Sequence, residues 1–270
     1  MPKISAYIIA YNEAEKIKEA IHSVLWADEI IVADSGSTDN TAVIAESLGA
    51  TVVQIPFEGF GNLRNETIKH CAHEWIFSLD SDERCTIETR DEIFSVIENK
   101  NSFDAYFVPR KNIFMGRWIK HAWGYPDYRQ PQLFKNGAMK YTSEPVHEGY
   151  ELLTDKPAGY LKNPIWQIAF RNLEEILNKA NRYSTLGVEK LIQKKIKPGV
   201  GTTLRHAFWA FLKHYFFKGG FLDGFPGFVI ALSNFEGVFY RYAKYLVQCD
   251  QKMKVPDSPP IDKPEKDSCP

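Results

Sequence analysis

The first eighty residues alternate between short apolar runs and stretches in which apolar residues recur at helical spacing. The apolar runs are rich in β-branched and aromatic residues, which favours buried strands. They cover Lys3–Tyr11, Glu29–Ala33, Thr51–Ile55 and Trp75–Leu79. Between them the spacing predicts helices from Ala14 to Leu25, from Thr41 to Leu48 and from Asn62 to His70. This alternation indicates parallel strands in a doubly wound α/β sheet.

Polar residues follow three of the four predicted strands. They are Tyr11-Asn12-Glu13, Asp34 at the start of a turn-forming segment, and Asp80-Ser81-Asp82. In a sheet of this kind, ligands bind outside the carboxyl ends of the strands. We therefore expect these three clusters to line one crevice.

The most informative of these clusters is the acidic pair Asp80 and Asp82, a DxD motif that ends an apolar strand. With a slight turn after Leu79, both carboxylates can face the same crevice. Mg²⁺ and Mn²⁺ prefer oxygen ligands and often keep water and substrate phosphates in their shell. The pair therefore predicts a platform for a metal and a diphosphate. The alternative is that these residues are ordinary turn formers after a strand.

Four successive motifs carry a family resemblance. In order they are Tyr11-Asn12-Glu13, Asp34–Thr41 (DSGSTDNT), Gly61–Asn65 (GNLRN) and Leu79–Glu83 (LDSDE). Together they resemble the signatures of family-2 glycosyltransferases over about residues 3–150. The resemblance implies a GT-A fold, which is an α/β, Rossmann-like nucleotide-sugar-binding domain. It also implies a nucleotide-diphosphate sugar donor, Mg²⁺ or Mn²⁺, and inversion at the anomeric carbon.

Further motifs are similar to a narrower branch, the lipopolysaccharide inner-core β-glucosyltransferases that modify heptose. They are Tyr106–Arg110 (YFVPR), Gly116-Arg117, Gly124–Asp127 (GYPD) and Val146-His147-Glu148. This similarity implies transfer of a hexose, with glucose expected, from a UDP-sugar to a lipid-linked glycan at the cytoplasmic face of the inner membrane.

One departure concerns Gln132, which stands where relatives of that branch usually carry a basic residue. It bears on the acceptor more than on the fold. Alternative acceptors are a polyprenyl phosphate, a capsule glycan or a protein side chain. An alternative of another class is a non-catalytic nucleotide-binding scaffold.

The donor-binding roles fall on residues around the predicted crevice. By resemblance the nucleoside lies along Tyr11 and Glu13, and the pyrimidine ring donates a hydrogen bond to Asp34. Asp80 is expected to hold the ribose or a metal-bound water, and Ser81 beside it is expected to bind the donor. Arg64 is expected to neutralise the diphosphate, since a guanidinium offers a planar fork of donors. The structural alternatives are a turn or capping role for Asp34 and a surface role for Arg64.

The reacting centre needs a metal and a base. Asp82 is the expected direct metal ligand, and His147 is a candidate second ligand, with a structural role as its alternative. Inverting transfer is a single displacement and demands one general base. We expect this base to be Asp127, with Glu148 as the second candidate.

Aromatic residues surround the candidate base, and aromatic faces commonly stack on sugar rings. The alternative is that they pack the core of the acceptor half. They are Trp118, Trp123 and Tyr125, with His121 beside them.

Composition excludes several classes of protein. The net charge of −1 gives no global basic field for nucleic acid. The four cysteines are scattered without CxxC pairing, so we expect reduced thiols rather than a zinc site or disulfides. We expect no secretory signal, since the chain opens on a strand, and no membrane-spanning helix, since no apolar run reaches about 18 residues.

The chain is expected to form a glycosyltransferase domain over residues 1–165, with a donor half at about 1–100 and an acceptor half at about 101–165. A mainly helical region, 166–250, and a disordered, proline-rich tail, 251–270, follow. Leu204–Phe217 and Phe228–Val247 combine aromatic and basic residues. Such amphipathic helices suit peripheral contact with a membrane interface. Packing within the chain or in a homo-oligomer is the alternative.

Overall fold

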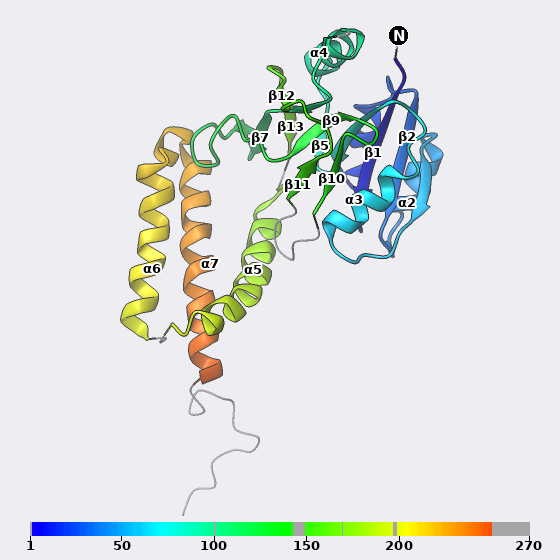
Figure 1. The fold of residues 1–270 in the computed structure, drawn as a ribbon. Helices are drawn as coiled ribbons and strands as arrows, with labels where there is room; N and C mark the ends of the chain where they lie inside the picture. Colours follow the sequence, from blue (N-terminus) through cyan, green and yellow to red (C-terminus); the bar gives the residue numbers. More distant parts are fainter. Residues whose placement is uncertain (1, 100, 143–148, 169, 197–198, 250–270) are drawn as a thin grey trace, which may run out of the picture. The chain divides into compact units, whose positions relative to one another are not determined.

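The computed structural model describes residues 2–99, 101–142, 149–168, 170–196 and 199–249. The chain divides into two compact units, Met1–Arg171 and Asn172–Pro270. The first is built on β-sheet and the described part of the second is helical (Figure 1). The expected class, an α/β domain followed by a helical extension, is therefore confirmed. The expected tail, 251–270, lies outside the described residues.

A seven-stranded sheet forms the centre of the first unit, in the order β12-β6-β9-β4-β1-β2-β3. The strands β1, β2, β3 and β4 are mutually parallel, as predicted. The strand β9 runs antiparallel between β4 and β6, so the complete sheet is mixed. The strands are β1 Ile4–Ala10, β2 Glu29–Asp34, β3 Thr51–Gln54, β4 Trp75–Asp80, β6 Ala105–Phe107, β9 Pro131–Lys135 and β12 Gly159–Tyr160.

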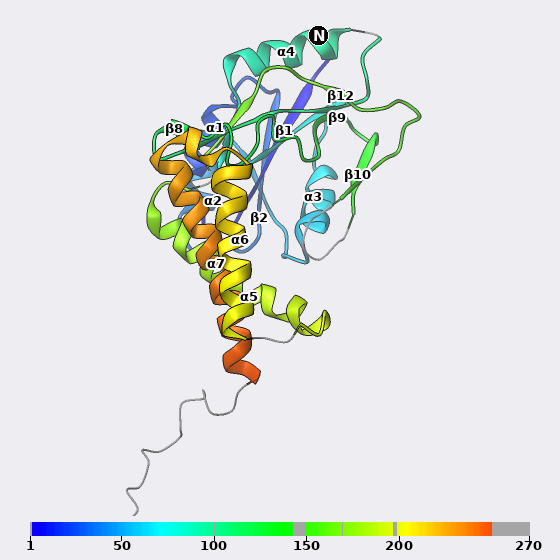
Figure 2. The ribbon, with the colours of Figure 1, turned by 90° about the vertical axis from the view of Figure 1, so that its left-hand side faces the viewer.

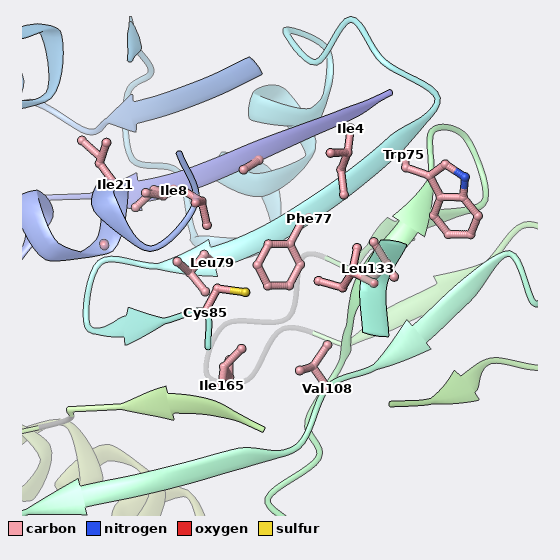
Figure 3. Close-up of a cluster of buried hydrophobic side chains, with 14 of the residues drawn as sticks. Ile4, Ile8, Ile21, Trp75, Phe77, Leu79, Cys85, Val108, Leu133 and Ile165 are labelled. Atoms are coloured by element: carbon pink, nitrogen blue, oxygen red, sulfur yellow. The ribbon is translucent and has the colours of Figure 1, made fainter. Parts of the chain in front are cut away.

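Both faces of this sheet are buried, which explains why its strands are continuous apolar runs rather than alternating ones. Alternate residues of β1 point to opposite faces: Ile4 and Ile8 join one core cluster, and Tyr7 and Ile9 join the other. The first cluster also contains Phe77 and Leu79 of β4 and is drawn in Figure 3.

Helices cover the two faces unequally. The helices α1 (Ile17–His22), α2 (Thr41–Ser47) and α4 (Ile87–Glu98) supply residues to the first cluster. The helix α3 (Phe60–Ile68) and the ribbon of β10 (Met139–Tyr141) and β11 (Tyr150–Leu152) cover the other face. The first helix is shorter than predicted, and Leu25 is 56% exposed instead of joining the core.

A second, four-stranded sheet follows the order β5-β13-β7-β8. Its strand β5 begins three residues after Asp80 and pairs with β13, more than eighty residues later in the chain. The sheet thereby brings late residues beside the acidic motif. The strands are β5 Glu83–Arg84, β13 Ile165–Gln167, β7 Arg110–Phe114 and β8 Arg117–Trp118.

The helical unit contains α5 (Leu173–Gln193), α6 (Val200–Leu212) and α7 (Phe225–Cys249). The helices α6 and α7 lie side by side (Figures 1 and 2). A π-helical turn, η1 (Lys213–Phe217), and a 3₁₀ turn, η2 (Gly220–Asp223), connect them. Among the described helices, none is both long enough and apolar enough to cross a membrane.

Candidate active site

The carboxyl ends of three neighbouring strands meet at one edge of the large sheet. In the strand register, Ala10 of β1 lies opposite Asp34 of β2, and Ile9 lies opposite Asp80 of β4. The prediction that these three strand ends share one edge is therefore confirmed. The exposed Tyr11 and the buried Ser81 come directly after two of these ends.

The loops after β1 and β2 are tied together by side-chain hydrogen bonds. Asn12 adopts a left-handed backbone conformation, with φ of 54°, which asparagine tolerates better than most residues. Its Oδ1 accepts a bond of 2.8 Å from the Thr38 backbone N–H, and its own N–H donates to Ser37 Oγ at 2.9 Å. The Glu13 N–H donates to Thr41 Oγ1 at 2.8 Å. The two motifs of the sequence thus form one rigid rim.

Asp34 is only 2% exposed and stabilises the loop after β2, which forms part of this rim. Its carboxylate accepts hydrogen bonds from the Ser37 backbone N–H at 3.2 Å and from Gln54 Nε2 at 2.8 Å, and also from the Ser37 hydroxyl. These contacts give Asp34 the turn-holding role that we considered as its alternative. Glu13 also has a local partner, since its carboxylate lies 3.3 Å from Lys16 Nζ.

Arg64 and Asp80 form an ion pair at the same edge. Arg64 projects from α3, its side chain is 4% exposed, and one guanidinium nitrogen lies 2.6 Å from Asp80 Oδ1. Another donates to Ser78 Oγ at 3.0 Å, and the guanidinium lies 5.5 Å from the ring centre of Tyr141. Burial alone would raise the pKa of Asp80, but the positive charges of Arg64 and Arg110 outweigh it and lower that pKa. Asp80 is therefore an anion at neutral pH.

A second ion pair supports the acidic motif from inside the protein. Arg110 Nε lies 2.6 Å from Glu83 Oε1, and the two side chains are 1% and 0% exposed. The other oxygen of Glu83 accepts bonds of 2.9 Å from the Asp80 backbone N–H and from Gln132 Nε2. Glu83 therefore holds the backbone at Asp80, where β4 ends and the acidic pair begins.

Gln132 occupies a buried position of this network. Its Nε2 also donates to the Ser78 carbonyl at 3.1 Å, while its Oε1 has no hydrogen-bond partner within the described part of the chain. Gln132 is 2% exposed and contacts Glu83, the residue that supports the acidic motif.

We expect Glu83→Ala to lower the free energy of unfolding by roughly 3–5 kcal/mol, because it leaves the buried Arg110 charge uncompensated. Urea denaturation of the purified variants measures this loss. Glu66→Ala is the control, since it breaks an exposed pair with Lys69 and should cost at most about 1 kcal/mol. Equal losses in the two variants would contradict a supporting role for Glu83.

A chain of hydrogen bonds connects the metal-ligand candidate with the candidate base. Gln167 Nε2 donates to Asp82 Oδ2 at 3.4 Å, and Gln167 Oε1 accepts from Arg129 at 3.2 Å. Arg129 donates twice to Asp127 Oδ2, at 2.7 and 3.1 Å. Asn112 Nδ2 approaches the same oxygen at 3.5 Å. The structure thus brings Asp82 and Asp127 into one polar network.

The aromatic residues around Asp127 separate into two groups. Trp118 is 37% exposed, meets the edge of Tyr125 at 5.0 Å between ring centres, and lies 4.5 Å below Lys111 Nζ. Trp123 instead packs against Phe114 and Phe170, with ring centres 5.9 and 6.2 Å away. Stacking on a sugar is therefore open to Trp118, whereas Trp123 has the packing role.

Two predicted site residues, His147 and Glu148, lie outside the described residues. Within the described part, no three His, Cys, Asp or Glu side chains are grouped as a metal site. The oxygen donors of Asp80 and Asp82 nevertheless fit Mg²⁺ or Mn²⁺, which bind proteins through one or two carboxylates and complete their shell with water and substrate phosphates.

Several residues of this network, among them Glu83, Arg110, Arg129 and Gln167, have no role assigned from the sequence. Glu83 and Arg110 stand inside the recognised motifs, and a charged residue directly after an apolar strand is a signal that could have singled out Glu83. Gln167 lies in no motif. It reaches Asp82 only because β13 pairs with β5, and its own segment gives no sign of that pairing.

Comparison with known proteins shows the family to which the chain belongs. The model of the family described as glycosyl transferase family 2 matches residues 5–156, more than half of the chain. A glycosyltransferase of Rickettsia bellii is 31% identical, with 98% of this chain and 97% of the relative covered. The lipopolysaccharide core biosynthesis glycosyltransferase LpsC of Rhizobium meliloti is 27% identical, with 90% and 93% covered.

Solved structures with a similar chain path include S. aureus TarS 1–349, at 15% identity and a TM-score of 0.48 over 90% of this chain and 91% of that one. Glucosyl-3-phosphoglycerate synthase from Mycobacterium tuberculosis is 25% identical, with a TM-score of 0.35 over 42% and 44%. The family match and the similarity along nearly the whole chain are sufficient: the chain is a glycosyltransferase of family 2.

Proposed function

We propose that the protein is an inverting, metal-dependent hexosyltransferase. It moves a hexose, with glucose as the first to test, from a UDP-sugar to an inner-core sugar of lipopolysaccharide. The observation that carries this proposal is the network from Asp82 through Gln167 and Arg129 to Asp127. It joins a candidate metal ligand to a candidate base at the edge where the strand ends meet.

The donor nucleotide is proposed to lie along the rim formed by the loops after β1 and β2. Tyr11 is 57% exposed there and can contact the base or the ribose. Asp34 holds the rim and is proposed to accept a hydrogen bond from the pyrimidine, with Glu13 and Ser81 beside the nucleoside. Arg64 orients Asp80 through their ion pair and adds positive charge near the diphosphate.

The metal is proposed to bind Asp82, with Asp80 beside the ribose or a metal-bound water and His147 as a second ligand. When bound, it supplies Lewis-acid stabilisation of the leaving diphosphate. Gln167 donates to one oxygen of Asp82 and thereby limits rotation of the carboxylate. Ligands are commonly oriented in this way by hydrogen bonds from a surrounding shell.

Asp127 is proposed to take the proton of the acceptor hydroxyl. As that oxygen forms a bond to the anomeric carbon, the bond from this carbon to the diphosphate breaks and UDP leaves. One displacement inverts the configuration and needs one base. Arg129 contacts a single oxygen of Asp127, and the other oxygen is the one proposed to accept the proton. Glu148 is the second candidate for the base.

The acceptor proposal rests on similarity to LpsC over 90% of the chain. A lipid-linked acceptor places the reaction at the cytoplasmic face of the inner membrane, with peripheral contact of the enzyme. The exposed Trp118 and its neighbour Tyr125 are proposed to stack on the acceptor sugar.

Transfer assays with purified protein test this function. UDP-glucose, Mn²⁺ and deacylated inner-core oligosaccharide should yield a product heavier by one hexose, and EDTA should abolish it. UDP-galactose and UDP-N-acetylhexosamines in parallel define the donor. Transfer to polyprenyl phosphate, to capsule glycan or to protein, but not to the core oligosaccharide, would overturn the acceptor assignment. UDP binding without hydrolysis or transfer to any of these acceptors would indicate a scaffold.

A further inference from the structure

The helix α6 exposes large apolar side chains and buries small ones. The side chains that it buries are those of Thr203 and Ala207. The exposed positions carry large apolar side chains instead, which reverses the usual pattern of a surface helix. They are Leu204, Phe208, Trp209 and Leu212, between 39% and 56% exposed.

This apolar surface continues through the connection from α6 to α7. We call its five exposed residues the aromatic tip: Phe216, Phe217, Phe221, Leu222 and Phe225, between 48% and 73% exposed. They fall within ten consecutive positions along the chain. Exposed apolar patches of this kind mark surfaces that contact a membrane or another protein.

The connection that presents the tip is tightly built. A Cβ on Gly227 would lie 1.9 Å from the carbonyl oxygen of Gly220, so the two backbones meet where only glycine fits. Below the tip, Tyr215 contacts the rings of Phe211 and Phe228, with centres 5.3 and 5.8 Å away. The exposed side chains of the tip are therefore presented by a connection whose own aromatic side chains are packed together.

The exposed charges beside the tip in the sequence are basic. Between Lys213 and Asn234 the chain carries two lysine residues, Lys213 and Lys218, and one acidic residue, Asp223, which is 5% exposed. Both lysines are exposed: Lys213 is the first residue of the π-helical turn, and Lys218 directly follows it.

We propose that the aromatic tip inserts into the interface of an anionic lipid bilayer, with Lys213 and Lys218 at the level of the headgroups. Burial of apolar area and attraction between basic side chains and anionic lipids both strengthen binding at such an interface. Protein–protein interfaces are also rich in aromatic residues but are depleted of lysine, which argues against a second copy of the chain as the occupant. This inference deepens the proposed function by naming the surface that makes the membrane contact.

Sedimentation with lipid vesicles tests the proposal on the full chain, without donor or acceptor. Wild type should bind vesicles containing phosphatidylglycerol and bind phosphatidylcholine vesicles much more weakly. The pair Phe217→Ser with Leu222→Ser should lower the partition coefficient about tenfold or more. The pair Lys213→Glu with Lys218→Glu should remove the preference for anionic lipid.

The matched control is the pair Tyr183→Ser with Leu186→Ser on α5, which are 52% and 58% exposed. It removes an aromatic and a leucine from the same unit and should change binding less than about twofold. A thermal unfolding transition like that of wild type shows that each variant is folded. The charge variant provides a second test if the tip variant does not fold.

Three results would overturn the proposal: no binding of wild type to anionic vesicles, an equal loss in the control pair, or a wild-type dimer that the tip variant converts to a monomer without any vesicle binding. Failure of sugar transfer is a separate result, because vesicle binding is measured without substrates. Transfer to a soluble acceptor with no vesicle binding would overturn only this inference.

Discussion

Asp82→Ala is expected to lower turnover at least about 10³-fold. A metal ion contributes several kcal/mol by stabilising charge on the leaving diphosphate, and each 1.36 kcal/mol is a factor of ten in rate. Release of UDP from UDP-glucose with the oligosaccharide acceptor measures the effect. Asp82→Asn should lose nearly as much activity, although its amide oxygen can still accept the hydrogen bond from Gln167.

Asp91→Asn is the control for Asp82, since Asp91 is an exposed aspartate on α4 paired with Arg90. It should retain full activity. The thermal unfolding of Asp82→Ala without ligand should stay close to that of wild type. Activity of Asp82→Ala within about tenfold of wild type would refute the assignment of Asp82 as the metal ligand.

Asp127→Asn is expected to lower kcat by about 10²–10⁴-fold, the usual contribution of a general base. The amide keeps the size of the side chain and can accept from Arg129, but it cannot take a proton. The affinity for UDP should remain within about twofold of wild type, because Asp127 is proposed to act on the acceptor. Steady-state kinetics and UDP titration together measure both quantities.

Glu148→Gln is the comparison for Asp127. If Asp127 is the base, Glu148→Gln keeps kcat within about tenfold of wild type. Loss of kcat in Glu148→Gln with activity retained in Asp127→Asn would move the base to Glu148. A loss of UDP affinity in Asp127→Asn would instead assign Asp127 to the donor side.

The four parallel strands of the large sheet, β1 to β4, could be predicted because burial in the sheet leaves an apolar run in the sequence, whereas β6, β9 and β12 were not predicted. The runs predicted at Glu29–Ala33 and Trp75–Leu79 each end one residue before the last residue of the observed strand. The placement of Asp34 and Asp80 at one edge then followed from the general rule for parallel sheets.

Partners across the sheets could not be predicted, because local periodicity holds no information about which strands pair. Arg64 was placed at the crevice, but its pairing with Asp80 depends on how α3 lies over the sheet. Gln167 contacts Asp82 across 85 positions of sequence, through a strand of three residues. Such short strands carry too few residues for a recognisable pattern.

In the helical unit, the positions at which the helices begin could not be predicted. The helix expected over Phe228–Val247 begins three residues earlier in the structure, since α7 begins at Phe225 and includes Pro226. Proline is accepted in the first turn of a helix, where its missing N–H would have no partner within the helix. Similarly, α6 begins at Val200, ahead of the aromatic segment, because helical geometry continues into residues with little apolar signal.

The most direct test of the account is a thermal-shift comparison of purified wild type with UDP, GDP, CMP and TDP, each with Mn²⁺ or EDTA. A ligand that binds only the folded protein raises its stability by RT ln(1 + [L]/Kd), so selective binding produces a selective shift. We predict stabilisation by UDP with Mn²⁺, lost with EDTA and in Asp82→Asn. Stabilisation by another nucleotide alone, or by none, would contradict a metal-dependent UDP-sugar site at Asp82.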